Sequence, residues 1–229
     1  MKKEIVVISL GGSLIIPEEI NTNVLNNFKK VILSNSGKYK FVVVCGGGSL
    51  ARKYINSLKK IKINEHLQSL AGISATRTNA RFMSYFFNQN PEKGISHKLR
   101  HIKKYLKKQE IVFCGALEYK PHQTSDSTAA DIAKEFNSIF INLTNINGLY
   151  TDNPLTNKNA KFIPKISWTE FNKIANKLKF KPGQHFVLDQ RASKIILENK
   201  IKTYILGKNM NNLNKLLKGK KFTGTTIEN

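Results

Sequence analysis

The chain has 229 residues, of which 40% are hydrophobic, and its 38 Lys and Arg against 15 Asp and Glu give a formal charge of +23. This composition excludes a disordered chain, and the length allows one domain with a sizeable core. No apolar run approaches the roughly 20 residues that cross a bilayer. The N-terminal residues also lack the long apolar stretch and cleavage site of a secretion signal, so we expect a cytoplasmic protein.

The high positive charge invites a nucleic-acid interpretation, which the distribution of cations disfavours. Only five of the 38 cations are Arg, the residue that binds phosphates and bases through two parallel hydrogen bonds. The densest cationic stretch, residues 97–108, carries Leu99, Ile102 and Leu106 at the spacing of an amphipathic helix with a solvated outer face. RNA binding stays as an alternative that predicts tight, steeply salt-dependent affinity.

Short continuous apolar runs predict buried strands, and apolar residues spaced three or four apart predict helices, with Ile20, Val24, Phe28, Val31 and Ile32 on one helix face. In chain order, the predicted elements are strand Glu4–Leu10, helix 20–34, strand Phe41–Cys45, helices 49–60 and 64–88, strand Ile111–Cys114, helix Ser125–Phe136, strand Ile139–Leu143, loop 144–161, helices Trp168–Leu178 and Gln190–Asn199 around a loop containing Lys181-Pro182-Gly183, strand Thr203–Leu206, a short helix, and strand Thr225–Ile227.

Strands that are apolar throughout and separated by helices are typical of a mostly parallel sheet that is covered on both faces. Such sheets bind ligands beyond the carboxyl ends of their strands. The two cysteines, Cys45 and Cys114, each end an apolar run. We therefore interpret both as reduced core residues and not as a disulfide or a metal site.

Three of these strand ends lead into small-residue loops that open helices: Gly11-Gly12-Ser13, Gly46-Gly47-Gly48-Ser49, and Gly115-Ala116 leading to Thr124. Glycine lets a backbone approach phosphate oxygens, and the following helix start supplies N–H donors. One such loop is usually just a tight turn, but three at one sheet edge indicate several phosphates. The Walker A pattern is absent, and a weak match of residues 46–51 to the dinucleotide fingerprint, with Glu65 as the acid, is a minor alternative.

The order of these motifs resembles the amino-acid kinase superfamily and, within it, archaeal-type uridylate kinases. The resemblance covers nearly the whole chain. The segments that carry it are Ser9–Ser13, Cys45–Tyr54, Ala75–Ala80, Thr124–Ala130, Thr144–Thr151, Leu188-Asp189 with Ala192–Ile196, and Gly224–Glu228.

This resemblance implies an α/β protein with a three-layer α/β/α sandwich around a central, mostly parallel sheet. It implies one amino-acid kinase-like domain over 1–229, with an N-terminal lobe of about 1–137 for the phosphate acceptor and a C-terminal lobe of about 138–229 for ATP. The implied reaction is transfer of a phosphoryl group from ATP to UMP with Mg²⁺, by a homohexamer. Because the acceptor phosphate is already ionised, the chemistry needs no general base.

The resemblance also implies roles for individual residues. Arg52 is the expected catalytic cation, and no protein side chain is expected to hold the metal, which would bind through the ATP phosphates. The expected ATP-binding residues are Gly12, Ser13, Gly48, Arg52, Thr144 and Tyr150. The expected UMP-binding residues are Gly47, Tyr119, Lys120, Pro121, His122, Gln123, Thr124 and Ser125. Simpler interpretations are a surface cation for Arg52, an N-cap for Thr124 or Ser125 and a loop-bracing aromatic for Tyr150.

Several positions depart from the family pattern. Ser9 stands where the superfamily often has Lys, Ser69 where an Asp is expected to bind the UMP ribose, and Asn153 where an Asp contacts ATP. Asn147-Gly148 replaces Asp-Gly, and Pro121-His122 replaces Pro-Gly. These changes keep two alternatives open: another small-molecule kinase of the superfamily, such as one acting on isopentenyl phosphate, acetylglutamate or aspartate, and a catalytically weakened nucleotide sensor.

Overall fold

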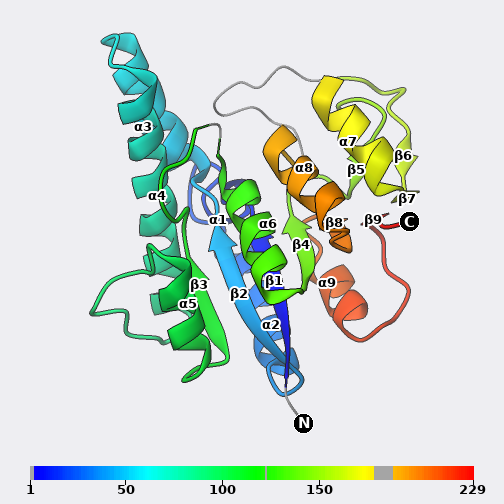
Figure 1. The fold of residues 1–229 in the computed structure, drawn as a ribbon, viewed down its shortest axis with the longest axis horizontal. Coiled ribbons are helices and arrows are strands. Elements are labelled where there is room, and N and C mark those ends of the chain that lie inside the picture. Colours follow the sequence, from blue (N-terminus) through cyan, green and yellow to red (C-terminus); the bar gives the residue numbers. More distant parts are fainter. Residues whose placement is uncertain (1–2, 122, 178–187) are drawn as a thin grey trace.

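The computed structural model describes residues 3–121, 123–177 and 188–229 and has a seven-stranded sheet at its centre (Figure 1). The strand order is β3-β2-β1-β4-β8-β9-β7, and all neighbours are parallel except the antiparallel β8–β9 pair. The strands of this sheet are β1 Glu4–Leu10, β2 Tyr39–Cys45, β3 Ile111–Cys114, β4 Ile139–Leu143, β7 Lys165–Ile166, β8 Thr203–Leu206 and β9 Thr225–Ile227. The mostly parallel sheet is therefore confirmed.

Helices cover both faces of the sheet, because its strands are apolar on both sides. In β1, Ile8 belongs to one core cluster and Val7 to the other, and Val43 and Val42 alternate likewise in β2. One face is covered by α1 Gly12–Ile15, α2 Thr22–Asn35, α4 Glu65–Phe86 and α9 Met210–Leu217. The other is covered by α5 Leu99–Leu106, α6 Ser125–Phe136, α7 Trp168–Lys177 and α8 Gln190–Glu198. The predicted three-layer sandwich is confirmed.

Within the described residues, the predicted strands and helices form close to their predicted bounds, and the main differences are the following. Ile20 is 44% exposed because it precedes Asn21, the N-cap of α2, and so lies off the buried helix face. The segment predicted as loop contains β5 Leu149–Tyr150, which pairs with β6 Phe162–Ile163 in a separate two-stranded sheet. Strand β7 has only two residues, too few to give a periodic signal. The predicted loop around Lys181-Pro182-Gly183 lies outside the described residues.

Helix α3, Gly48–Lys60, packs against α4, and the pair projects beyond the end of the sheet (Figure 1). Apolar side chains on this pair and its connecting turn stay exposed: Ile61 by 68%, Tyr54 by 46% and Leu67 by 45%. Cys45 and Cys114 are buried free thiols, as predicted, and burial raises the pKa of Cys114 to about 12. In the described part of the chain, no helix combines the length and apolarity needed to span a membrane.

Candidate active site

The loops that follow β1 and β2 touch backbone to backbone at the carboxyl edge of the sheet. A Cβ atom added to Gly12 would lie 2.0 Å from the Gly48 nitrogen, and one added to Gly46 would lie 2.4 Å from the Gly12 nitrogen. Gly48 also has a φ of 60°, a conformation that side chains disfavour. These contacts hold a cradle of backbone groups together, and only glycine fits there. Such a cradle suits phosphate oxygens.

Two helices begin at this cradle, α1 at Gly12 and α3 at Gly48. Ser49, in the first turn of α3, is 2% exposed, and its hydroxyl has no hydrogen-bond partner in the described part of the chain. A buried hydroxyl without a partner costs free energy unless a ligand satisfies it. Sequence reasoning gave Ser49 no role of its own, although it ends the second glycine motif. The orphan donor and the helix start both fit an anionic group.

Helix α4 fixes the glycine cradle and the loop after β3 from one side. The amide of Asn79 donates to the Gly46 carbonyl at 2.7 Å. The Thr76 hydroxyl accepts from the Ala116 N–H at 2.9 Å, and the Arg77 guanidinium donates to the Ala116 carbonyl at 3.1 Å. The motif over residues 75–80 therefore positions two loops at once.

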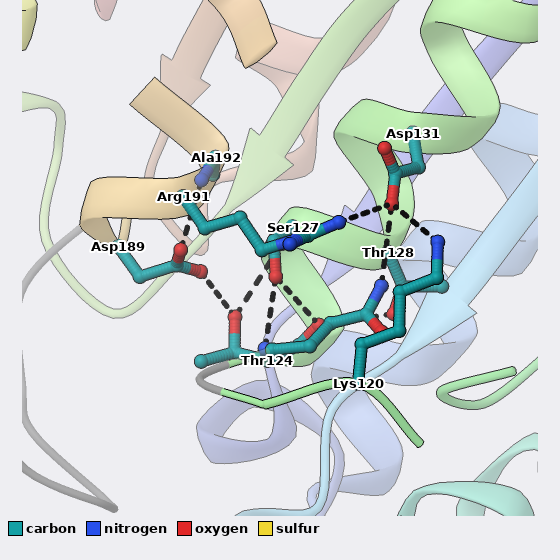
Figure 2. Close-up of polar contacts among 9 residues, drawn as sticks. Lys120, Thr124, Ser127, Thr128, Asp131, Asp189, Arg191 and Ala192 are labelled. Carbon is teal, nitrogen blue, oxygen red and sulfur yellow. Dashed lines mark hydrogen bonds and ion pairs between the residues drawn. The ribbon is translucent and has the colours of Figure 1, made fainter. Parts of the chain in front are cut away.

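The start of α6 lies at the same edge. Thr124 caps the helix, because its hydroxyl oxygen accepts from the N–H groups of Asp126 at 3.1 Å and Ser127 at 3.4 Å. In return, the Thr124 N–H donates to the Ser127 hydroxyl at 2.9 Å. The Thr124 hydroxyl also donates to Asp189, which caps α8 through the Ala192 N–H at 2.8 Å (Figure 2). The N-cap interpretation of Thr124 is thus confirmed, and its contact with UMP stays a prediction.

Asp126 points from α6 toward the ends of β1 and β4. Its Oδ1 accepts from the Ser9 hydroxyl at 2.6 Å and from the Asn142 amide at 2.9 Å. Removal of the carboxyl group from water raises the pKa of Asp126 to about 7, the hydrogen bond from Ser9 opposes the shift, and the nearby Asp189 carboxylate adds to it. Burial also raises the pKa of Asp189, which is 4% exposed.

Within residues 3–121, 123–177 and 188–229, no Lys or Arg forms an ion pair with either Asp126 or Asp189. Two close carboxyl groups without a cation are expected to favour a positive ligand or to keep a proton. Sequence reasoning included both residues in the family motifs without giving them a role. The signal that could have found them is an acid beside each of two predicted helix starts.

The other predicted site residues are distributed over this edge. Arg52 donates to the Pro17 carbonyl at 3.1 Å and lies 4.0 Å from Glu18, so its guanidinium braces the segment after α1. Thr144 follows β4, where its N–H donates to the Leu206 carbonyl at 2.9 Å. Tyr150 packs edge-on against Phe162 in the small sheet, at a centroid distance of 5.3 Å.

The predicted acceptor residues form the loop that leads to α6. The Tyr119 ring packs edge-on against His66 of α4, with 4.4 Å between ring centroids. Lys120 and Gln123 both contact Asp131 of α6. Pro121 is exposed, Ser125 is the first residue of α6, and His122 lies outside the described residues. Gly47 precedes α3, and Ser13 lies within α1.

Comparisons with known proteins agree with this architecture. The model of the amino acid kinase family matches residues 4–207. The uridylate kinase of Thermococcus kodakarensis is 31% identical over 225 residues, which are 97% of this chain and 99% of that protein. The uridylate kinase structure from Archaeoglobus fulgidus is 32% identical with a TM-score of 0.81, over 97% of this chain and 99% of the other.

A UMP kinase structure from Ureaplasma parvum is 24% identical and has a TM-score of 0.79 over the full length of both chains, which shows a shared fold. The family model thus spans β1 to β8, and the archaeal relatives match over nearly the whole chain. The chain therefore belongs to the amino acid kinase family.

Proposed function

We propose that this protein is a uridylate kinase that transfers the γ-phosphoryl group of ATP to UMP and forms UDP and ADP in pyrimidine nucleotide biosynthesis. Archaeal relatives with that name match nearly the whole chain at about the same length. The observation that carries the proposal is the glycine cradle, where two loops after neighbouring parallel strands touch backbone to backbone and leave no room for a Cβ atom. It lies at one sheet edge with the starts of α1, α3 and α6, which suits two phosphorylated ligands.

In this proposal the protein works by placement and charge, since the UMP phosphate is already a nucleophile at neutral pH. Gly12, Ser13 and Gly48 would bind the ATP phosphates, and Gly47 the UMP phosphate. Arg52 would stabilise negative charge on the group in transfer. The remaining proposed contacts are Thr144 and Tyr150 with the ATP base and ribose, and Tyr119, Lys120, Pro121, His122, Gln123, Thr124 and Ser125 with UMP.

In this proposal Mg²⁺ would bind through the phosphates of ATP. Among the residues that the structure describes, no cluster of three or more His, Cys, Asp or Glu could hold a metal ion alone. The raised pKa values of Asp126 and Asp189 show carboxyl groups that a cation nearby would stabilise. When bound, Mg²⁺ would neutralise phosphate charge, and the Asp126 carboxylate, oriented by Ser9 and Asn142, would favour a cation at this edge of the sheet.

We also propose that the N-terminal lobe, about residues 1–137, binds UMP and the C-terminal lobe, about 138–229, binds ATP. The protein would act in the cytoplasm as a homo-oligomer, a hexamer by resemblance. The exposed apolar residues Tyr54, Ile61 and Leu67 on the projecting α3–α4 pair support an interface between copies. Light scattering on the purified protein tests this, and a monomer at micromolar concentration would contradict it.

The test of function is ADP release by the purified chain with Mg-ATP and a panel of acceptors: UMP, CMP, AMP, isopentenyl phosphate and acetylglutamate. We expect UMP to give the highest kcat/KM. Turnover of UMP no faster than that of CMP and AMP would overturn the proposal. Faster turnover of isopentenyl phosphate or acetylglutamate would instead assign another kinase activity of the same family.

The second candidate is a nucleotide sensor without appreciable turnover. The observation that favours it is that Ser9 supplies only a hydroxyl to Asp126, where a Lys is frequent in the superfamily. A sensor would bind ATP or UTP in calorimetry and release no ADP with any acceptor. Release of ADP with UMP at a rate well above the background hydrolysis of ATP would exclude it.

A further inference from the structure

Asp131 of α6 contacts the loop that precedes this helix; we call its described residues, 117–121 and 123, the acceptor loop. Asp131 lies about two turns into α6, and its Oδ2 atom is shared by three side chains (Figure 2). The Lys120 ammonium lies 3.5 Å away, the Gln123 amide 3.4 Å and the Arg191 guanidinium 3.5 Å. Lys120 and Gln123 belong to the acceptor loop, and Arg191 belongs to the first turn of α8. One carboxylate therefore links the loop to α6 and α8.

The two halves of the acceptor loop are held by different parts of the molecule. The first half is held from α4 and α5: Arg77 binds the Leu117 carbonyl, Lys98 lies 3.4 Å from Glu118, and His66 packs on Tyr119. The second half is a turn in which the Gln123 N–H donates to the Lys120 carbonyl at 3.2 Å.

Both ends of this turn contact Asp131 through their side chains. The backbone bond joins Gln123 to Lys120, and Asp131 holds the side chains of both residues against α6.

Two cations lie beside Asp131, so the position of the acceptor loop depends on the single negative charge of this residue. Lys120 and Arg191 are both cations, so without Asp131 they would repel each other across the loop. The three charged side chains are partly exposed, by 50% for Lys120, 29% for Asp131 and 37% for Arg191. Ion pairs at this exposure add little to global stability and are screened by salt. Loss of the charge should therefore move the loop and leave the fold intact.

We propose that Asp131 is a positioning residue for the nucleotide acceptor: it holds the second half of the acceptor loop against α6 and α8 and thereby lowers the KM for the acceptor. The proposal rests on the proposed function in one respect, namely that this loop encloses the acceptor. Asp131 itself touches no reacting group in this account and acts through Lys120 and Gln123.

The test compares Asp131→Asn with Glu135→Gln in the full chain. Glu135 is one turn further along α6 and pairs with Lys103 of α5, away from the acceptor loop. We expect Asp131→Asn to raise the KM for UMP about fivefold with kcat within about twofold, as three weak contacts predict. The ratio of variant to wild-type KM should fall toward one near 1 M salt, where the Debye length is about 3 Å. Asp131→Glu should restore most of the affinity, and Glu135→Gln should match the wild type.

A second measurement tests the contacts of Asp131 with the acceptor loop, which we call the tether, independently of the proposed function. Hydrogen exchange of the loop amides, measured without nucleotide, should be faster in Asp131→Asn and unchanged in Glu135→Gln. If the wild type turns over no UMP, the proposed function fails while the exchange experiment still tests the tether. An unchanged KM for UMP in an active Asp131→Asn enzyme, or unchanged exchange in a folded one, would overturn the proposal.

Discussion

The glycine cradle (Gly12, Gly46 and Gly48) and the buried carboxyl pair (Asp126 and Asp189) lie at the same edge of the sheet but are stabilised in opposite ways. In the cradle, Gly12, Gly46 and Gly48 touch through backbone atoms and leave no room for a side chain. In the carboxyl pair, Asp126 and Asp189 are held by hydroxyl and amide groups, and their pKa values are raised. Backbone contacts close the cradle, whereas no Lys or Arg among the described residues forms an ion pair with the carboxyl groups. Close backbone packing therefore determines the shape of the cradle, whereas burial of two acidic groups determines the electrostatics of the carboxyl pair.

Substitution in the cradle should have the largest effect. Gly12→Ala places a Cβ atom 2.0 Å from the Gly48 nitrogen, a contact that backbone atoms can relieve only by moving. We expect a loss of about 3 kcal/mol in the free energy of unfolding and no nucleotide binding, as for other overpacked interiors. Urea denaturation and calorimetry with ATP measure both effects.

Gly37→Ala is the matched control, because a Cβ atom there meets nothing within 4 Å. Its free energy of unfolding should stay within about 0.5 kcal/mol of the wild type. If Gly12→Ala were as stable as Gly37→Ala and bound ATP normally, the cradle would not be the closely packed unit that we describe.

The carboxyl pair should make the free energy of unfolding depend on pH. Asp126 has a pKa of about 7 in the folded protein against an ordinary value of 3.8, so the folded state holds its proton more tightly than the unfolded state. The resulting stabilisation is complete at low pH and is lost as the pH rises from about 4 to about 7. Asp126→Asn cannot titrate, so its free energy of unfolding should fall less over that range. Denaturation series at pH 4.5 and 8 measure the difference.

Asp152→Asn is the control for this experiment. Asp152 is exposed in the loop after β5, and a hydrogen bond from Asn157 lowers its pKa, so it does not titrate in the same range. It should reproduce the wild-type pH dependence. An equal pH dependence in Asp126→Asn and the wild type would show that Asp126 is already ionised in the folded protein.

The sequence predicts the cradle better than the carboxyl pair, and the reason is physical. Glycines after apolar strands are a local signal, and parallel strands bring their carboxyl ends to one edge. The seven-residue strand Glu4–Leu10 was therefore predicted with its full bounds, and so was helix Ser125–Phe136. The carboxyl pair joins Asp126 to Ser9, 117 positions earlier, and Thr124 to Asp189, 65 positions later. No local pattern encodes such distant contacts.

The same reasoning explains the missed strands and the orientation of Arg52. Strands β5, β6 and β7 have two residues each, so partners distant in the sequence decide whether they form. The helical position of Arg52 is predictable, but its contact with the Pro17 carbonyl depends on where the chain turns after α1.

Arg52 is a cation in α3, the helix that begins at the cradle, and its removal should have the next largest effect. Arg52→Ala deletes the cation that we expect to stabilise the transferring phosphoryl group, so kcat/KM should fall roughly 100-fold. Steady-state ADP release measures it. Lys53→Ala is the control, since Lys53 also lies near Glu18, at 3.8 Å, but is 67% exposed. If Arg52→Ala were as active as Lys53→Ala, the role of Arg52 would be only structural, through its hydrogen bond to the Pro17 carbonyl.

The smallest effect is expected on the acceptor side, at Ser69 of α4, where the family pattern has an Asp for the ribose. A carboxylate is a stronger acceptor than a hydroxyl, so Ser69→Asp should lower the KM for UMP a few-fold, equivalent to about 1 kcal/mol. The same charge at the exposed Ser74 of α4 is the control for electrostatic effects on an anionic substrate. Ser74→Asp should leave KM unchanged or raise it slightly, because it adds repulsion without a ribose contact. A higher KM for UMP in Ser69→Asp than in Ser74→Asp would mean that Ser69 does not face the ribose of UMP.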